Sequence, residues 1–468
     1  MTVRQFNLVV PLAPQKNAAA TVMRATDTAG QMDLFGASGA VSPLIGACAG
    51  LRQGDVDSTN GHSIATGTIT PGRRTSTTAT RTTTTRTTSF PSVSSADQTA
   101  ERHAEFSFEA LVRAYIDCRK NKRSKHSARA FEVDQEAGLF QLYSDLTDGS
   151  YCPGRSICFV ITRPKAREVW AAEFRDRIVH HLLYNHIAPR FERAFIADSC
   201  ACIKGRGTLY AAERLETKVR SITQNWQRPT YYLKCDLANF FVSIDKHILR
   251  DLLAARITEP WWMRLTELVL FHDPRNNAQI HSPPARMALV PTHKSLLNQA
   301  AHFGLPIGNL SSQFFANVYL NALDQFVKHQ LRCRHYIRYV DDFILLHESP
   351  KQLTAWHNAI EEFLPRELNV RLNPAKTIRQ PVARGIDFVG QVIKPWRRIL
   401  RRRTFREALS RIYTIDAADV FTTANSYFGL ARQATHSHTD RTRIANLVRK
   451  RGLAVDYRLT KSYRGAGT

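Results

Sequence analysis

The chain has 468 residues, of which 43% are hydrophobic and 22% charged, so a wholly disordered protein is excluded and two or three subdomains can form. Its net charge of +25 predicts a polyanionic partner, most simply nucleic acid. An anionic membrane surface is the competing partner, but no basic amphipathic anchor stands out and no apolar run approaches the ~20 residues of a membrane span, so we expect no membrane partner.

Residues 1–104 differ in composition from the rest of the chain. Gly, Ala, Ser and Thr dominate, and no apolar period is sustained, so we expect a disordered Ser/Thr-rich extension. Its arginines could contact a phosphate backbone, but a linker, or upstream sequence translated from a wrongly assigned start, is the favoured interpretation. The eight cysteines are scattered without zinc-ribbon spacing, and no signal-peptide core is present, which favours reduced thiols and a cytoplasmic location.

From Phe106 the apolar residues recur at helical spacing, and two β-like runs follow around residues 157–169. Lys165 and Arg167 lie in the turn between these runs. Lysine supplies a point charge and arginine a forked donor, so such a hairpin can fold over a triphosphate. An exposed basic hairpin without a ligand is the alternative.

An acidic strand is predicted in the stretch of residues 231–241. Its period-two alternation turns Leu233, Cys235 and Leu237 to one face, and the other face carries Tyr232, Lys234 and Asp236. Five positions on, the ring of Phe241 can exclude a ribose 2′-hydroxyl by volume, whereas we expect Phe240 to pack in the core.

Residues 272–302 are polar and are predicted to form an insertion or loop. A Pro/Gly turn follows, and Ser311 or Ser312 is predicted to cap a buried helix. The start of this helix would line a cleft beside an incoming base pair. The residues of the turn and helix start that we expect there are Ile307, Gly308 and Gln313.

Residues 336–346 predict a tight hairpin with Asp341 and Asp342 at its tip. Two adjacent carboxylates between apolar strands are costly unless a cation neutralises them, although a solvated acidic turn is the simpler alternative. Asp236 beside Asp341 would complete a hard-oxygen site that suits Mg²⁺.

The C-terminal part is increasingly basic. Lys376 lies in a turn from which it could protonate a departing pyrophosphate, with a plain exposed lysine as the alternative. Residues 385–393 predict a β-hairpin, and from Trp396 onward arginines precede helical patterns. A cationic helical element of this kind could grip a duplex backbone.

Taken in order, these motifs resemble those of reverse transcriptases over roughly residues 106–465. The resemblance implies an α+β right-hand polymerase with fingers at 105–228, an antiparallel-sheet palm at 229–394 and a helical basic thumb at 395–468. It also implies template RNA, a primer or cDNA strand, deoxynucleotides and two Mg²⁺ ions. The implied metal ligands are Asp236, Asp341, Asp342 and the carbonyl of Leu237, the implied triphosphate contacts are Lys165 and Arg167, and the implied sugar gate is Phe241.

Within that family, residues 307–313 are similar to the signature of diversity-generating retroelement enzymes, and residues 426–429 resemble their thumb. Those enzymes copy RNA with frequent errors opposite adenine, and they usually work with a small basic helical-bundle partner. Many reverse transcriptases carry glutamine where this chain has Ile307, so a polar contact to the incoming base would be lost. A retron or phage-defence (antiviral) reverse transcriptase remains an alternative, and an inactive RNA-binding scaffold is an alternative of another class.

Overall fold

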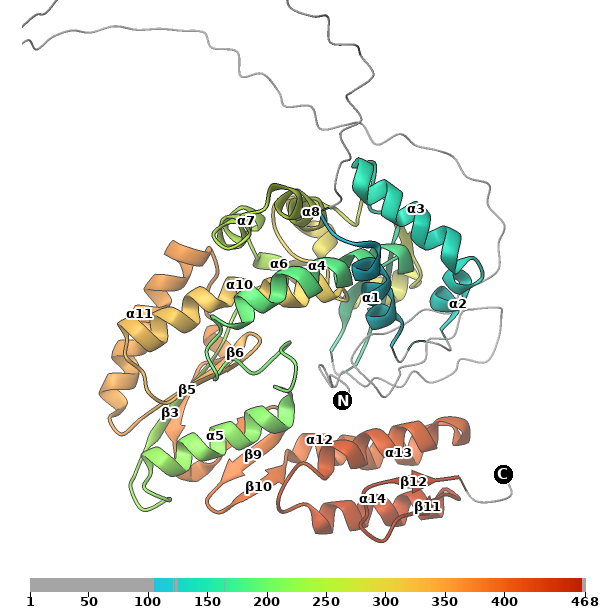
Figure 1. Cartoon of the computed structure of the whole chain (residues 1–468). Helices are drawn as coiled ribbons and strands as arrows, with labels where there is room; N and C mark the ends of the chain where they lie inside the picture. The colour runs from blue at the N-terminus through green and yellow to red at the C-terminus, as the bar shows by residue number, and fades with distance from the viewer. Residues whose placement is uncertain (1–104, 121, 123–124, 164, 465–468) are drawn as a thin grey trace, which may run out of the picture. The chain divides into compact units, whose positions relative to one another are not determined.

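The computed structural model describes residues 105–120, 122, 125–163 and 165–464, so the predicted N-terminal extension lies outside the described residues. The described chain is an α+β structure in which helices and strands alternate irregularly along the sequence (Figure 1). In the described part of the chain, no helix combines the length and the apolar character needed to cross a bilayer.

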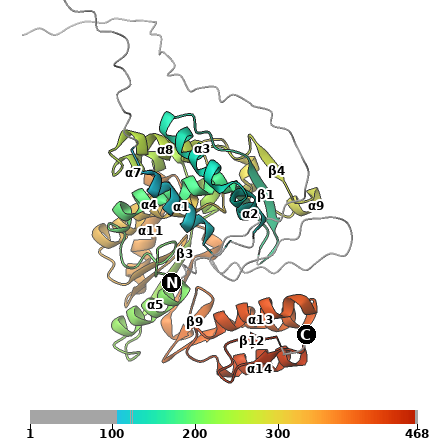
Figure 2. The same cartoon turned by 45° about the vertical axis from the view of Figure 1, so that its right-hand side comes forward.

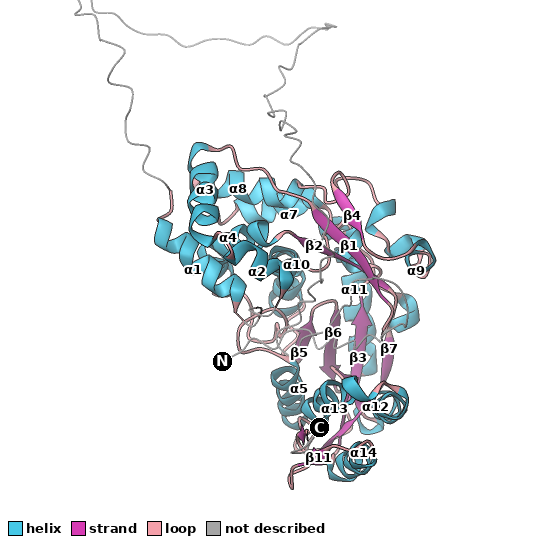
Figure 3. Ribbon diagram, turned by 90° about the vertical axis from the view of Figure 1, so that its right-hand side faces the viewer, coloured by secondary structure: helices cyan, strands magenta, loops and turns pink. Residues whose placement is uncertain are grey.

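The central sheet has four antiparallel strands in the order β5-β6-β3-β7 (Figure 3). The two sides of β3 meet different cores. Leu233 and Cys235 join the large core, whereas Tyr232 joins a second core with β6 and the C-terminal strands, which confirms the predicted alternation. The strands are β3 (Tyr231–Asp236), β5 (Tyr336–Tyr339), β6 (Asp342–His347) and β7 (Ile378–Pro381).

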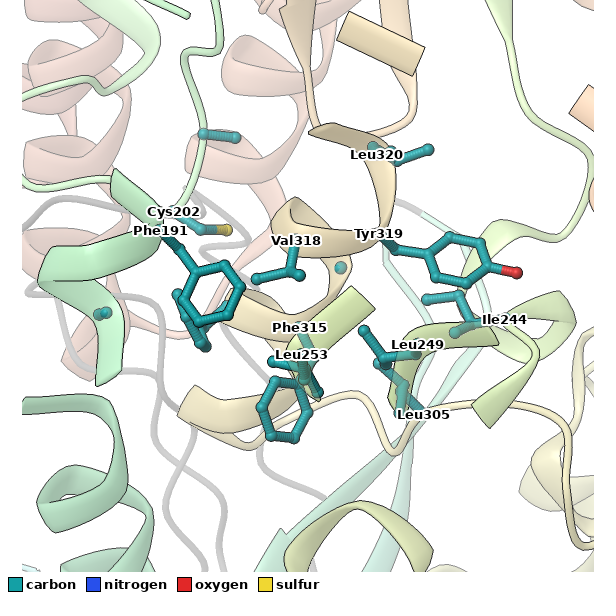
Figure 4. Packing of buried hydrophobic residues seen from close by; sticks show 14 of the residues in the cluster. Phe191, Cys202, Ile244, Leu249, Leu253, Leu305, Phe315, Val318, Tyr319 and Leu320 are labelled. Carbon is teal, nitrogen blue, oxygen red and sulfur yellow. The ribbon is translucent and has the colours of Figure 1, made fainter. Parts of the chain in front are cut away.

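Helix α10 (Leu310–Gln325) lies at the centre of the large core. It packs against α4 (Phe174–Glu192) and α7 (Lys246–Ala254), and a π-helical turn continues it over Phe326–Gln330. Phe315, Val318 and Tyr319 of α10 are surrounded by buried residues of these helices (Figure 4). Helix α11 (Pro350–Leu368) covers β3 and β6, and α5 (Thr208–Ile222) packs near β5 and β6 in the second core.

The predicted basic hairpin is formed by β1 (Ser156–Ile161) and β2 (Arg167–Ala172), which pair antiparallel. The prediction that residues 272–302 are only a loop is wrong, because β4 (Ala278–Ile280) pairs parallel to β1 (Figure 2). A buried carboxylate explains this docking: Glu168 of β2 accepts hydrogen bonds from the Ser295 hydroxyl and the Leu296 amide. The helices of this region are α1 (Phe108–Arg119), α2 (His126–Glu132), α3 (Gln135–Asp148), α8 (Pro260–Phe271) and α9 (Pro284–Met287).

The C-terminal region begins with a three-stranded antiparallel sheet, β8 (Ile386–Phe388), β9 (Gln391–Lys394) and β10 (Arg397–Leu400). Three helices then share a core of their own, because Phe405, Ala408 and Ile412 recur at helical spacing on one side of the first of them. The exposed side of that helix carries Arg402, Arg403 and Arg406. The remaining elements are α12 (Arg402–Thr414), α13 (Ala417–Ala431), α14 (His438–Lys450), β11 (Ala454–Val455) and β12 (Ser462–Tyr463).

Candidate active site

The acidic residues lie in a tight hairpin as predicted, but Asp342 belongs to strand β6 and only Asp341 lies in the turn. Tyr339 and Asp342 are paired in the β5–β6 ladder, so the connecting turn consists of Val340 and Asp341 alone. Val340 is buried and has a φ of +55°, a conformation that β-branched residues rarely adopt. Such strain persists only where the surrounding structure imposes it, which is common at functional sites. The strained turn presents Asp341 next to the first residue of β6.

Asp236 lies directly opposite Asp342 in the β3–β6 ladder, so three carboxylates gather at one end of the sheet. Burial, with the charges of Asp236 and Asp342, raises the pKa of Asp341 to about 7. Burial also raises the pKa of Asp342, although Lys234 opposes this shift. Clustered carboxylates that resist ionisation are stabilised by a cation. The predicted meeting of two distant acidic segments is therefore present in the structure.

Two lysines contact the carboxylates. Lys376 forms an ion pair with Asp236, and Lys234 Nζ lies 3.7 Å from an Asp342 carboxylate oxygen. The sequence predicted a role for Lys376 but none for Lys234, which it placed only on the same strand face as Asp236. The signal was available, because strand alternation places Lys234 on the same face of β3 as Asp236.

The donor set suits a hard cation such as Mg²⁺, which prefers carboxylate and carbonyl oxygens. The backbone around Leu237 is fixed on both sides: the Asn373 amide donates to the Asp236 carbonyl over 2.8 Å, and the Ala238 amide donates to the Arg371 carbonyl over 2.9 Å. Among the described residues, no three His, Cys, Asp or Glu side chains are preassembled as a metal site. Asp236 and Asp342 are instead partnered by the two lysines.

The basic hairpin of β1 and β2 adds positive charge to the same site. The pKa of Lys165 is lowered by partial burial and by the charges of Lys376, Lys294 and Arg167, while Asp236 opposes the shift. Lys165 therefore lies near the Asp236 carboxylate and among three other cations. A concentration of cations of this kind suits a polyphosphate. Lys294 was missed from the sequence because its segment was interpreted as a loop without a docking site.

The Pro/Gly turn that precedes α10 contacts strand β2. The Trp170 amide donates to the Ile307 carbonyl over 2.7 Å, and Gly308 has a φ of +135°. A Cβ at Gly308 would lie 2.6 Å from the Trp170 carbonyl oxygen, so only glycine fits there. This close approach fixes the turn against the strand that begins with Arg167.

Phe241 and Gln313, two further residues that the sequence predicts at a nucleotide site, can also be placed in the structure. The Leu305 amide donates to the Phe241 carbonyl over 2.8 Å, which places Phe241 beside the Pro/Gly turn. Its ring is half-buried, whereas Phe240 is buried in the large core as predicted. Gln313 is half-buried near the start of α10.

The predicted serine cap is wrong. Ser311 and Ser312 lie inside α10, and Asn309 occupies the N-cap position. Its side-chain oxygen accepts the Ala172 amide over 3.2 Å instead of capping the helix, because the turn is bonded to β2. The interaction with β2 therefore replaces the local cap that the sequence predicts.

A comparison with known protein families finds a match over the same part of the chain. The model of the family described as reverse transcriptase (RNA-dependent DNA polymerase) matches residues 163–393, which include the second strand of the basic hairpin, the three carboxylates and Lys376. A search of curated proteins found no match.

Solved structures similar to this chain include two yeast telomerases. One is telomerase from Candida albicans in complex with a fragment of telomeric RNA, with 12% identity, a TM-score of 0.40, and coverage of 64% of this chain and 54% of that one. The other is apo telomerase from Candida tropicalis truncated from its C-terminal domain, with 12% identity, a TM-score of 0.37, and coverage of 52% and 53%. The chain spans about half the length of each of these structures.

The family match covers the strands, the turn and the hairpin that bring the acidic and basic side chains together. RNA templates and deoxynucleotides are the substrates of this family. Residues 163–393 thus form a reverse transcriptase domain of right-hand polymerase type.

Proposed function

We propose that this chain is an RNA-directed DNA polymerase, and that it is the error-prone reverse transcriptase of a diversity-generating retroelement. The observation that supports this subgroup is the apolar Ile307 in a turn that is bonded to β2 beside the nucleotide site. An isoleucine offers no hydrogen bond to an incoming base. A polar side chain at this position could favour the correct base by such a bond, so an isoleucine is expected to discriminate less strongly against a mispaired base.

We assign the site residues as follows. Asp236, Asp341, Asp342 and the Leu237 carbonyl would hold two Mg²⁺ ions, which would supply Lewis-acid stabilisation of the charge on the primer 3′-oxygen and on the leaving pyrophosphate. The carboxylates would fix the position of the reacting strand end at the tip of the β5–β6 hairpin. The 3′-hydroxyl gives its proton to solvent, its oxygen forms a bond to the α-phosphate, and the bond from the α-phosphate to pyrophosphate breaks.

The cations of the site have separate roles in this proposal. Lys165, Arg167 and Lys294 bind the triphosphate, because they surround the end of the basic hairpin nearest Asp236. Lys376 gives a proton to the departing pyrophosphate, since its ammonium group already contacts the Asp236 carboxylate. Phe241 excludes the ribose 2′-hydroxyl, while Ile307, Gly308 and Gln313 line the position of the base pair.

The proposed subdomains are fingers at 105–228, palm at 229–394 and thumb at 395–468. The core formed within residues 400–459 supports a separate thumb, and its exposed arginines suit a duplex backbone. We further expect a cytoplasmic location and a small basic helical-bundle accessory protein as partner.

Primer extension on an RNA template with Mg²⁺ tests the assignment of the carboxylates. Wild-type protein should add deoxynucleotides, and Asp341→Ala should abolish addition while leaving the binding of the primer–template unchanged. Equal incorporation by both proteins would reject the site, and an inactive scaffold would show binding without incorporation by either.

The error spectrum tests the subgroup. The wild type should misincorporate opposite template adenine far more often than opposite other bases, and Ile307→Gln should reduce those errors by about tenfold, the effect of a modest hydrogen-bond difference. Uniformly low error rates in the wild type would instead favour the retron or phage-defence alternative.

A further inference from the structure

Arg338 is a fully buried arginine in the strand that leads into the acidic turn. Its side chain is 1% exposed, and that of its ion-pair partner Asp324 is 0% exposed. The guanidinium donates to both Asp324 carboxylate oxygens, over 2.8 and 2.6 Å, in a bidentate pair. A bidentate pair fixes the plane of the guanidinium as well as its charge.

The same guanidinium holds the turn that carries Asp341. Its Nη1 donates to the Val340 carbonyl oxygen over 3.1 Å. This carbonyl belongs to the peptide bond between Val340, whose φ is +55°, and Asp341. The hydrogen bond therefore acts on the peptide whose orientation sets the position of the Asp341 backbone.

Further bonds connect Arg338 to elements distant in sequence. Nη1 also donates to the Asn317 side chain over 3.2 Å, and Nη2 donates to the Ser199 hydroxyl over 2.9 Å. Asn317 and Asp324 both lie on α10, the helix that begins just after the Gly308 turn. The guanidinium is thus a rigid junction between the acidic turn and the helix that lines the nucleotide site.

We propose that Arg338 is a positioning residue of the polymerase, which holds the strained Val340–Asp341 turn in the geometry that binds metal ions and aligns it with α10. This inference depends on the proposed role of Asp341 as a metal ligand.

If the Arg338–Asp324 pair served stability alone, its replacement would affect folding but not the alignment of the acidic turn. Replacing both members of a buried pair by neutral residues is often neutral for folding, whereas removing one leaves an uncompensated charge. Neutral apolar residues cannot replace the hydrogen bond to the Val340 carbonyl, because that bond requires a donor at position 338. A folded protein without Arg338 should therefore lose alignment of the turn while retaining its stability.

The test uses the full-length double variant Arg338→Met with Asp324→Asn. The asparagine keeps an acceptor for the Tyr336 hydroxyl, which bonds Asp324 over 2.8 Å. The matched control is Tyr336→Phe, which alters the same network without touching Val340. Folding is checked by circular dichroism and a cooperative thermal transition, and metal binding by titration with Tb³⁺ alone, monitored by its luminescence.

We expect the double variant to fold, to bind Tb³⁺ about tenfold more weakly, and to require about tenfold more Mg²⁺ for half-maximal primer extension, with kcat reduced about 100-fold. The KM for primer–template should change little, and Tyr336→Phe should match the wild type. A folded double variant with wild-type Tb³⁺ affinity and kcat would overturn the proposal.

Arg338→Lys is the second variant, and it decides the matter if the double variant does not fold. A lysine can still neutralise Asp324 but cannot at the same time reach the Val340 carbonyl, so Tb³⁺ affinity and kcat should fall in the same direction. Wild-type values in a folded Arg338→Lys protein would also overturn the proposal. Failure of the underlying function is distinguishable, because then Asp341→Ala itself would leave Tb³⁺ binding and extension intact.

Discussion

Lys376 forms an ion pair with Asp236, although 140 positions separate them in the sequence. The pair is possible because β7, which follows Lys376, is the neighbour of β3 in the sheet. Lys376 is still 44% exposed, so its ammonium group is free to turn toward a ligand while Asp236 stays buried. The contact thus joins a carboxylate of the proposed metal site to the proposed proton donor.

The first prediction concerns Lys376→Gln, which removes the proton donor. We expect single-turnover nucleotide addition to slow by about 100-fold, the usual effect of losing a general acid, with less than a threefold change in the KM for deoxynucleotide. Lys376→Arg is the control: it restores the charge beside Asp236 but holds its proton too tightly to release it, so the rate should stay low. A wild-type rate in Lys376→Gln would contradict the assignment.

Local sequence pattern was sufficient for much of this site. Alternation in β3 and the apolar flanks of Asp341 and Asp342 predicted both acidic strands, because period and turn chemistry are local properties. The docking of residues 272–302 could not be predicted, since it depends on the buried Glu168 accepting the Ser295 and Leu296 donors. Lys294 was missed for that same reason, and the serine cap was wrong because Asn309 bonds a distant strand.

The buried Arg338–Asp324 pair was also outside the reach of sequence reasoning. An arginine between Ile337 and Tyr339 in a strand looks like an exposed residue of an amphipathic edge, since arginine is rarely buried. Only the tertiary structure supplies Asp324, Asn317 and Ser199 as partners. Non-local polar networks of this kind have no periodic signature.

Gly308→Ala is predicted to disrupt the Pro/Gly turn that packs against β2. Its Cβ would lie 2.6 Å from the Trp170 carbonyl oxygen, and its φ of +135° is strained for any L side chain, so we expect a loss of about 2 kcal/mol or more in the free energy of unfolding. Gly429→Ala is the control, because it lies within α13 with nothing within 4 Å of its Cβ, and alanine should stabilise that helix slightly. Urea unfolding of both variants checks this, and equal stabilities would contradict it.

The stability of the fold should depend on pH through His180. This buried imidazole lies near Ser311, and burial, with the charges of His272 and Arg177, lowers its pKa to about 3 from an ordinary 6.5. A lowered pKa means that the stabilisation is present above pH 6.5 and is lost as the pH falls below it, because only the unfolded chain binds the proton. The loss is about 1.4 kcal/mol per pH unit, or about 2 kcal/mol at pH 5 from this side chain.

His180→Gln removes the imidazole that takes up this proton when the chain unfolds. Between pH 7 and 5, the fall in the free energy of unfolding should be smaller than in the wild type by about 2 kcal/mol. Urea titrations at several pH values measure this, and an unchanged slope in His180→Gln would show that His180 is not held neutral by the fold.

Two adjacent phenylalanines provide the last prediction. Phe241 is half-buried beside the Pro/Gly turn, and Phe240 is 2% exposed in the large core. Phe241→Ala should therefore open space for a ribose 2′-hydroxyl and reduce the preference for deoxynucleotides over ribonucleotides by at least about tenfold, with little loss of stability. Phe240→Ala should do the reverse: it should cost about 3–5 kcal/mol of stability by leaving a cavity. Competitive incorporation of both sugars and urea unfolding separate the two effects. A Phe241→Ala protein that still rejects ribonucleotides as strongly as the wild type would exclude Phe241 as the sugar gate.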